Sequence, residues 1–179
     1  MRTPVGVLVT LLLLCGFARA QPLEPDLRTD RTGWFKAQIR CAAVLAHTEA
    51  GNQDDRGQRM VVWVAAQRAL ENRPYWGGGT ICKVAYHQRI TKKGETVSEF
   101  TGVHNPPNLP EGHAALVRAE WNARAVLLGE WKPAVELQSA RFYQNPVHAD
   151  PSRSRWFEKK LHELGAVGDH IFYREKGPG

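Results

Sequence analysis

Apolar residues recur at helical spacing in two segments that follow one another closely. The first segment spans residues 34–47, and its apolar stripe consists of Trp34, Ala37, Cys41, Val44 and Leu45. The second runs from about Gly57 to Glu71, with Asp54 or Asp55 as its N-cap. Its middle is too apolar for a surface helix. The pattern therefore predicts a central, buried second helix with Trp63 in the core.

Three further elements follow in the middle of the chain. Residues 80–87 favour a short helix after the glycine-rich connection 77–79, and a hairpin is expected around residues 92–95, with Val97 and Phe100 facing inward. A third long helix is predicted over residues 111–128, with Pro110 at its first position. The apolar residues expected on one side of that helix are Ala115, Val117, Trp121, Ala125 and Leu128.

The C-terminal part predicts a short strand and a last helix. Residues 141–143 precede Pro146 and favour a strand or an extended edge. Asp150 and Pro151 can cap and open a helix that continues to Leu164 and is closed by Gly165. The fold class is therefore mainly α with a small β hairpin, without internal repeats.

The first 20 residues have the layout of a secretory signal. Arg2 precedes an apolar stretch, and small residues precede Gln21. The stretch is short for a membrane span, so we expect cleavage rather than a retained anchor. Residues 1–20 are then a signal peptide, residues 21–32 an extended lead-in, and residues 33–175 a single domain. We expect an exported protein of the periplasm, cell wall or extracellular space, with no stable membrane insertion after cleavage.

Two cysteines, Cys41 and Cys82, remain after signal removal. An even pair in an exported chain favours a disulfide, here closing a loop of about 40 residues. Two reduced cysteines in the core are the alternative. The bridge would tie the first helix to a distant segment.

Charge and histidine spacing exclude several classes of function. The formal net charge falls from +6 to +4 when the signal peptide is removed, and the charges are dispersed, which argues against nucleic acid and permits an anionic wall polymer. The histidines form no metal-binding pair on one helix, and the cysteines lack zinc spacing. We expect no metal and no cofactor.

Glu49 is the leading candidate for chemistry. It ends the first helical segment and precedes a turn-rich tract, so its carboxylate sits where a helix meets a loop. A carboxyl half sunk in apolar surroundings keeps its proton to higher pH and can act as a general acid. A solvated glutamate in a last helical turn is the alternative.

Several separated blocks of sequence resemble the cell wall hydrolase family typified by the spore cortex-lytic enzymes. The blocks cover roughly residues 40–175 and occur in the family's order. They are Leu45-Ala46-His47-Thr48-Glu49-Ala50, Gly57-Gln58, the apolar run ending in Gln67-Arg68, Thr80 to Tyr86, and Gly168-Asp169-His170-Ile171-Phe172-Tyr173.

The resemblance implies a lysozyme-like domain that cleaves the β-1,4 bond between N-acetylmuramic acid and N-acetylglucosamine in peptidoglycan. It implies a lytic transglycosylase in which Glu49 protonates the leaving oxygen and then, as carboxylate, takes the C6 hydroxyl proton. The implied partners are peptidoglycan glycan strands. The sequence identifies no activator protein.

The chain departs from the family pattern beside Glu49. The usual Arg-Gly-Glu is Gly51-Asn52-Gln53, so a second acidic group has become an amide. Glu99, near a family Gln-Phe-Ser stretch, is a candidate second carboxylate, with a plain surface residue as the alternative. Two hypotheses therefore compete with transglycosylation: hydrolysis by a two-carboxylate muramidase, and a wall-binding module that has lost activity.

Substrate-binding candidates come from the family blocks. Phe100 and Thr101 follow the predicted hairpin, where a ring could stack on a sugar and a hydroxyl could bind an N-acetyl group. Tyr143 and Asn145 flank Gln144, which stands at a family histidine position. A phenol near the scissile bond could stabilise developing charge. His170 in the closing block could line the groove or serve as a structural histidine.

Overall fold

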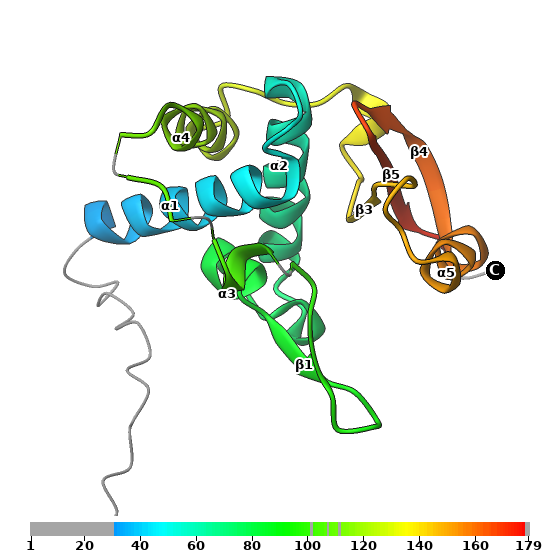
Figure 1. Cartoon of the computed structure of the whole chain (residues 1–179). Coiled ribbons are helices and arrows are strands. Elements are labelled where there is room, and N and C mark those ends of the chain that lie inside the picture. Colours follow the sequence, from blue (N-terminus) through cyan, green and yellow to red (C-terminus); the bar gives the residue numbers. More distant parts are fainter. Residues whose placement is uncertain (1–30, 101, 107, 111, 178–179) are drawn as a thin grey trace, which may run out of the picture.

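The computed structural model describes residues 31–177, apart from residues 101, 107 and 111. The predicted signal peptide and most of the lead-in therefore lie outside the described residues. Three helices, α1 (Arg31–Ala50), α2 (Asp55–Glu71) and α4 (Ala114–Leu127), pack against one another, and the short α3 (Ile81–Ala85) packs on α1 and α2. A sheet with α5 (Pro151–Lys160) lies to one side of these helices (Figure 1). The predicted class, mainly α with small β elements, is confirmed.

Helix α2 lies at the centre, as its apolar run predicts. Val61, Val62 and Val64 are fully buried, and Asp54 caps the helix by accepting a hydrogen bond from the Gly57 N–H. Trp63 packs against the core but is only half-buried, and its indole Nε1 donates to the Gln138 carbonyl at 3.1 Å. The prediction of a core tryptophan is therefore correct for its packing but not for its full burial.

Helix α4 differs from the prediction in its start and in its buried face. It begins at Ala114 with His113 as N-cap, so Pro110 is not its first residue. The buried residues are Ala119, Asn122, Ala123 and Val126. Trp121, on the expected apolar side, is 69% exposed. Polar contacts explain why another face of α4 is buried. Asn122 donates to Asp55 and Gln58 and accepts from Arg59, so the face of α4 that carries Asn122 turns toward α2.

The C-terminal segment contains a sheet of which the sequence pattern predicted only the strand near residues 141–143. Helix α5 ends at Lys160, and β4 (Leu161–Val167) turns into β5 (His170–Glu175). Strand β5 lies between β4 and β3 (Phe142–Gln144), and both pairings are antiparallel. The predicted helix to Leu164 is therefore wrong beyond residue 160. Pairing with β5 supplies backbone hydrogen bonds that a local helical pattern cannot anticipate.

A two-stranded hairpin projects from the helical part, as predicted around residues 92–95 (Figure 1). Its strands are β1 (Gln88–Ile90) and β2 (Thr96–Ser98). The described part of the chain also contains the 3-10 turns η1 (Pro74–Trp76), η2 (Gly102–His104) and η3 (Val135–Leu137). In the described part of the chain, no helix has the length and apolarity to cross a membrane.

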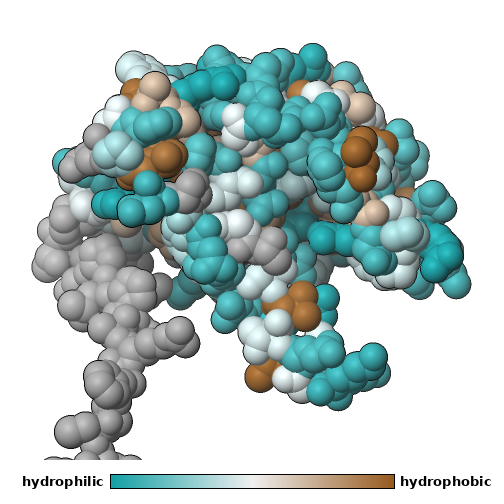
Figure 2. Space-filling model, in the orientation of Figure 1, coloured by the Kyte–Doolittle hydropathy of each residue, from teal (hydrophilic) through white to brown (hydrophobic). Residues whose placement is uncertain are grey.

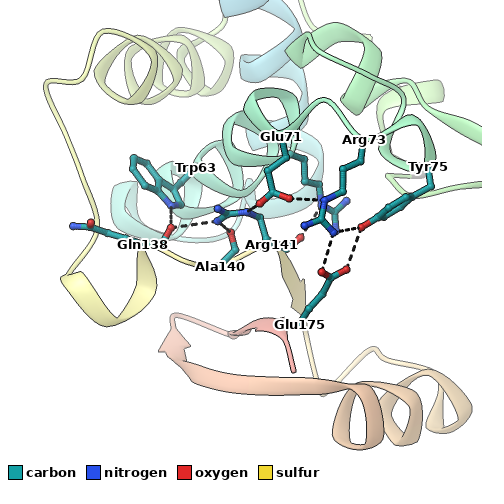
Figure 3. A network of polar contacts seen from close by, with 9 residues as sticks. Trp63, Glu71, Arg73, Tyr75, Gln138, Ala140, Arg141 and Glu175 are labelled. Atoms are coloured by element: carbon teal, nitrogen blue, oxygen red, sulfur yellow. Dashed lines mark hydrogen bonds and ion pairs between the residues drawn. The ribbon is translucent and has the colours of Figure 1, made fainter. Parts of the chain in front are cut away.

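Covalent and ionic links hold these parts together. Cys41 on α1 and Cys82 on α3 form a disulfide, which confirms the predicted pairing. Figure 3 shows an ionic network in which Glu71, at the end of α2, binds both Arg73 and Arg141, and Arg73 also binds Glu175 of β5 at 2.8 Å. The network joins the end of the central helix to strand β5.

Candidate active site

A cleft runs between the hairpin and the face formed by β3 and α5. It has two adjoining lobes of about 680 and 670 Å³. The residues that line both lobes are Arg68, Ser98, Glu99, Tyr143 and Arg153. Figure 2 shows the surface hollowed beside the projecting hairpin. We call the lobe that contains Glu49 the acid lobe, and the lobe lined by Tyr75, Trp76 and Trp156 the aromatic lobe.

Glu49 lies in the last turn of α1 and lines the acid lobe. Burial raises the pKa of the Glu49 carboxyl, whereas the Gly102 N–H, the Tyr143 hydroxyl and the charge of Arg153 act to lower it. Desolvation is the largest of these effects, so the protonated form is favoured to higher pH than in a free glutamate. A carboxyl in this state can deliver a proton to a bound substrate.

Gly102 brings a backbone N–H to the Glu49 carboxylate. A Cβ at position 102 would lie 2.7 Å from the Thr48 Cβ and 3.4 Å from Glu49 Oε1. Only glycine therefore permits this close approach of η2 to the end of α1. Thr48 is itself held by its hydroxyl, which donates to the Val44 carbonyl at 2.9 Å. The end of α1 and the turn η2 are thus packed closely where the Glu49 carboxyl lies.

Tyr143 on β3 faces the same carboxyl. Its hydroxyl donates to Glu49 Oε2 at 3.4 Å, and its ring stacks on Phe100 and meets His170 edge-on, at centroid distances of 6.2 and 5.1 Å. Burial and the charge of Glu49 hold the pKa of the Tyr143 phenol well above its usual range. The phenol therefore stays neutral and can act as a hydrogen-bond donor.

Glu99 also lines the cleft, in both lobes, directly after the hairpin. It forms an ion pair with Arg89 of β1 at 3.3 Å. The structure thus brings the candidate second carboxylate into the cavity that holds Glu49.

The remaining predicted binding residues reach the site to different degrees. Asn145 and His170 line the acid lobe, and burial lowers the pKa of the His170 imidazole. Phe100 lines it too, but only 3% of the residue is exposed, so its ring mainly packs against the ring of Tyr143. Gln144 is buried, and its amide donates to the Tyr173 hydroxyl at 2.9 Å. Thr101 lies outside the described residues.

Gln53, the departure from the family pattern, lies outside the cleft lining and anchors the β4–β5 turn. Its side-chain amide donates to Asp169 Oδ2 at 2.7 Å and accepts from the Asp169 N–H at 2.9 Å. The residue is 6% exposed. The next residue after Asp169 is His170, so the amide positions one wall of the acid lobe.

We expect Gln53→Glu to destabilise the fold by about 2 kcal/mol at neutral pH, because it replaces a buried donor with a second carboxylate against Asp169. The effect should shrink toward pH 4. The like charge of Asp169 raises the pKa of the introduced carboxyl in the folded state. The variant therefore loses stability as pH rises and ionises this carboxyl, and regains stability as pH falls and protonates it. Urea unfolding at several pH values measures it.

The matched control exchanges donor and acceptor across this contact. Adding Asp169→Asn to Gln53→Glu restores one donor and one acceptor, so most of the lost stability should return. A single variant as stable as the parent at pH 7, or a double variant no better than the single one, would contradict this account of Gln53.

Sequence reasoning assigned no role to several cleft residues. Arg68 stands in the Gln67-Arg68 block but was given no function, and Arg153 and Trp156 carried no signal of their own. The spacing of α5 puts Arg153 and Trp156 about one turn apart, facing the hairpin across the cleft. Only the packing of α5 beside the hairpin reveals them.

No group of three or more His, Cys, Asp or Glu side chains within the described ranges is arranged to hold a metal ion. The polar groups around Glu49 are a phenol, a backbone amide and arginines, which bind carboxylates and other anions.

A family model described as Cell Wall Hydrolase matches residues 52–173, more than half of the chain. The match begins three residues after Glu49 and includes Glu99, Tyr143 and His170. No curated protein and no solved structure matches the chain significantly.

Proposed function

The chain belongs to the cell wall hydrolase family, and on that premise we propose that it is an exported lytic transglycosylase with Glu49 as its acid and base. A family of this kind acts on peptidoglycan, the cell wall polymer. The finer assignment, cleavage of the β-1,4 bond after N-acetylmuramic acid, is supported above all by one observation. Glu49 is a half-buried carboxyl with a raised pKa on the wall of a long cleft.

Protonated Glu49 would give its proton to the glycosidic oxygen as the bond from that oxygen to the muramic C1 breaks. The resulting carboxylate would then take the proton of the C6 hydroxyl while O6 bonds to C1, which closes a 1,6-anhydro ring. The proton count balances, Glu49 ends protonated, and no water is consumed. Because one carboxyl performs both transfers, the scheme needs no second acid.

Tyr143 and Gly102 suit the charge changes at Glu49. Both donate toward the carboxyl, so they stabilise the carboxylate that forms after the first proton transfer. Both hydrogen bonds also lower the pKa of Glu49 and so offset part of the increase that burial causes. The acid is thereby kept strong enough to release its proton.

We expect Tyr143→Phe to lower the maximal cleavage rate about tenfold, the worth of one hydrogen bond of about 1.4 kcal/mol. Loss of the donor also raises the pKa of Glu49. The reaction needs protonated Glu49, so the loss of activity with rising pH should move to higher pH in the variant. Turbidity clearing of isolated peptidoglycan across pH measures both effects. An unchanged pH–activity profile would contradict a role for Tyr143 in setting the pKa of Glu49.

Product analysis tests the proposed reaction directly. Purified mature protein is incubated with isolated peptidoglycan, and soluble fragments are identified by mass spectrometry. Fragments ending in 1,6-anhydro-N-acetylmuramic acid are expected. Reducing-end fragments would instead establish a hydrolase, and no fragments would favour a wall-binding module.

Hydrolysis is the second candidate, because Glu99 lines the same cleft as Glu49. A two-acid scheme needs carboxyls about 5 to 9 Å apart and a water between or behind them. Glu99→Gln separates the schemes: a transglycosylase retains most of its activity in this variant, whereas a two-carboxylate hydrolase loses nearly all of it. Glu163→Gln, on the exposed part of β4, is the matched control.

A further inference from the structure

Arg68 is a buried cation that forms no ion pair with any carboxylate in the described part of the chain. It lies near the end of α2, is 5% exposed, and lines both lobes of the cleft. Its Nε donates to the Arg141 carbonyl at 2.7 Å. Among the residues that the structure describes, it forms no ion pair. Burying an unpaired charge is costly, so such groups usually meet a counter-charge.

Aromatic rings hold the Arg68 guanidinium in place without neutralising it. Its central carbon lies 5.5 Å from the Trp76 ring, 5.4 Å from Phe100 and 5.2 Å from Phe142. Cation–π contacts and the single Nε bond fix the plane of the group. The planar fork of an arginine held in this way is suited to a carboxylate, which it can bind through two parallel hydrogen bonds.

A second arginine faces the same place. Arg153 of α5 also lines both lobes, and it forms no ion pair within the described part of the chain. Burial lowers the pKa of Arg68 most, the charge of Glu99 raises it, and the charge of Arg153 lowers it further, so the two arginines act on each other. Like charges that converge on one cavity favour an anion between them.

The acidic groups of the cleft are already engaged. Glu99 is paired with Arg89, and Glu175 with Arg73. Asp150 accepts hydrogen bonds from the backbone at the start of α5. Burial favours the protonated form of Glu49. The charges of Glu99 and Glu49 act on Arg68 and Arg153 over a distance, but no described carboxylate forms an ion pair with either arginine. That position is therefore open to a carboxylate of a ligand.

We propose that Arg68, assisted by Arg153, binds a carboxylate of the substrate where the acid lobe meets the aromatic lobe. The proposal rests on the proposed function, which puts a glycan strand in this cleft. Two groups of peptidoglycan carry the required chemistry. One is the lactyl carboxylate of a muramic acid whose peptide has been removed, and the other is a carboxylate of the peptide stem.

The test measures binding to the Glu49→Gln protein, which does not consume its ligand. The probes are soluble glycan strands freed of peptide by an amidase, intact strands, and both preparations after their carboxylates have been converted to methylamides. N-acetylglucosamine oligomers serve as the neutral reference. We expect conversion to methylamides to weaken binding about 10- to 100-fold, the range for hydrogen bonds to a charged group.

The same series with Arg68→Met added assigns the effect to this residue. Methionine fills an apolar setting without charge, so the variant should bind free and methylamidated strands within about twofold of each other. A purely structural role for Arg68 would weaken binding of both forms alike. Arg124→Met, on the exposed side of α4, is the matched control and should keep the full preference.

The arms also identify the source of the carboxylate. Sensitivity confined to peptide-free strands assigns the lactyl group, and sensitivity confined to intact strands assigns the stem. If Arg68→Met does not fold, the comparison of free and methylamidated strands on the Glu49→Gln protein and on its Arg153→Gln variant carries the test. Equal binding of the two forms, absent binding of every strand, or a preference that survives Arg68→Met would overturn the proposal.

Failure of this proposal differs from failure of the proposed function. A protein that releases fragments from free and methylamidated strands at equal rates is a glycosidase without the carboxylate site. A protein that prefers free strands but releases no fragments has the site without the glycosidase activity. The two measurements are independent because one follows binding and the other follows products.

Discussion

Glu49→Gln is expected to lower peptidoglycan cleavage by about 10²- to 10⁴-fold, the range attributed to general acid–base catalysis. The amide preserves the size and shape of the side chain but carries no transferable acidic proton. Glutamine keeps one of the two carboxylate oxygens, so it can still accept a hydrogen bond from either the Tyr143 hydroxyl or the Gly102 N–H, but not from both. Release of soluble fragments per unit time measures the loss.

Two further measurements on this variant separate catalysis from folding. Binding to insoluble peptidoglycan should be retained, because the cleft is unchanged. Thermal unfolding at pH 7 should occur at a higher temperature than in the parent. Burial raises the folded-state pKa of Glu49, so the carboxylate costs stability as pH rises above the unfolded value, and the amide removes that cost. At low pH the difference should disappear.

The matched control is Glu120→Gln, which makes the same chemical change on the exposed side of α4. It should leave both cleavage and its pH dependence unaltered. Cleavage by the Glu49→Gln protein at the parent rate would show that Glu49 is not the catalytic acid, and Glu99 would then be the carboxylate to test.

Removing the disulfide is expected to cost about 4 kcal/mol of unfolding free energy, as the chain-entropy estimate for a loop of this length indicates. The bridge joins α1 to α3, and α1 carries Glu49 at its end. Gln38 adds a weaker link, since its side chain accepts a hydrogen bond from the Cys82 N–H at 3.2 Å. Urea unfolding of a Cys41→Ala, Cys82→Ala protein measures the loss.

Reductant provides the control for this prediction. Dithiothreitol should lower the stability of the parent toward that of the double alanine variant and leave the variant itself unaffected. A reductant effect on both proteins, or on neither, would contradict a stabilising bridge. A loss below about 1 kcal/mol would mean that packing of α3 on α1 and α2 suffices without the bond.

Local sequence patterns predicted the elements whose structure depends on neighbours along the chain. The helices predicted over residues 34–47 and 57–71, which the structure extends to 31–50 and 55–71, follow from periodicity, and the hairpin near residues 92–95 follows from its turn residues. Of the two candidate caps, Asp54 and Asp55, the structure uses Asp54. The approximate place of the strand at Phe142–Gln144 was predicted as well. These elements need little information from distant parts of the chain.

Where a segment's state depends on partners far away in sequence, the patterns failed. Residues 161–164 were expected to continue a helix, but they pair with β5. The apolar stripe on α4 predicted the wrong buried face, because Asn122 binds Asp55, Gln58 and Arg59 from 63 to 67 positions away. The role of Gln53 could not be predicted from the sequence for the same reason, since its partner Asp169 lies 116 positions away.

The sequence by itself determined the helical character of the domain, the cysteine pair, the family resemblance and the choice of Glu49 as the candidate acid. Each of these depends on residue identity and short-range spacing. Only the tertiary structure decided the environment of Glu49. Its burial, its contacts with Gly102 and Tyr143, and the meeting of Arg68 with Arg153 in one cleft arise from packing between α1, α2, β3 and α5. Desolvation and charge–charge effects depend on distances in space, which spacing along a chain does not specify.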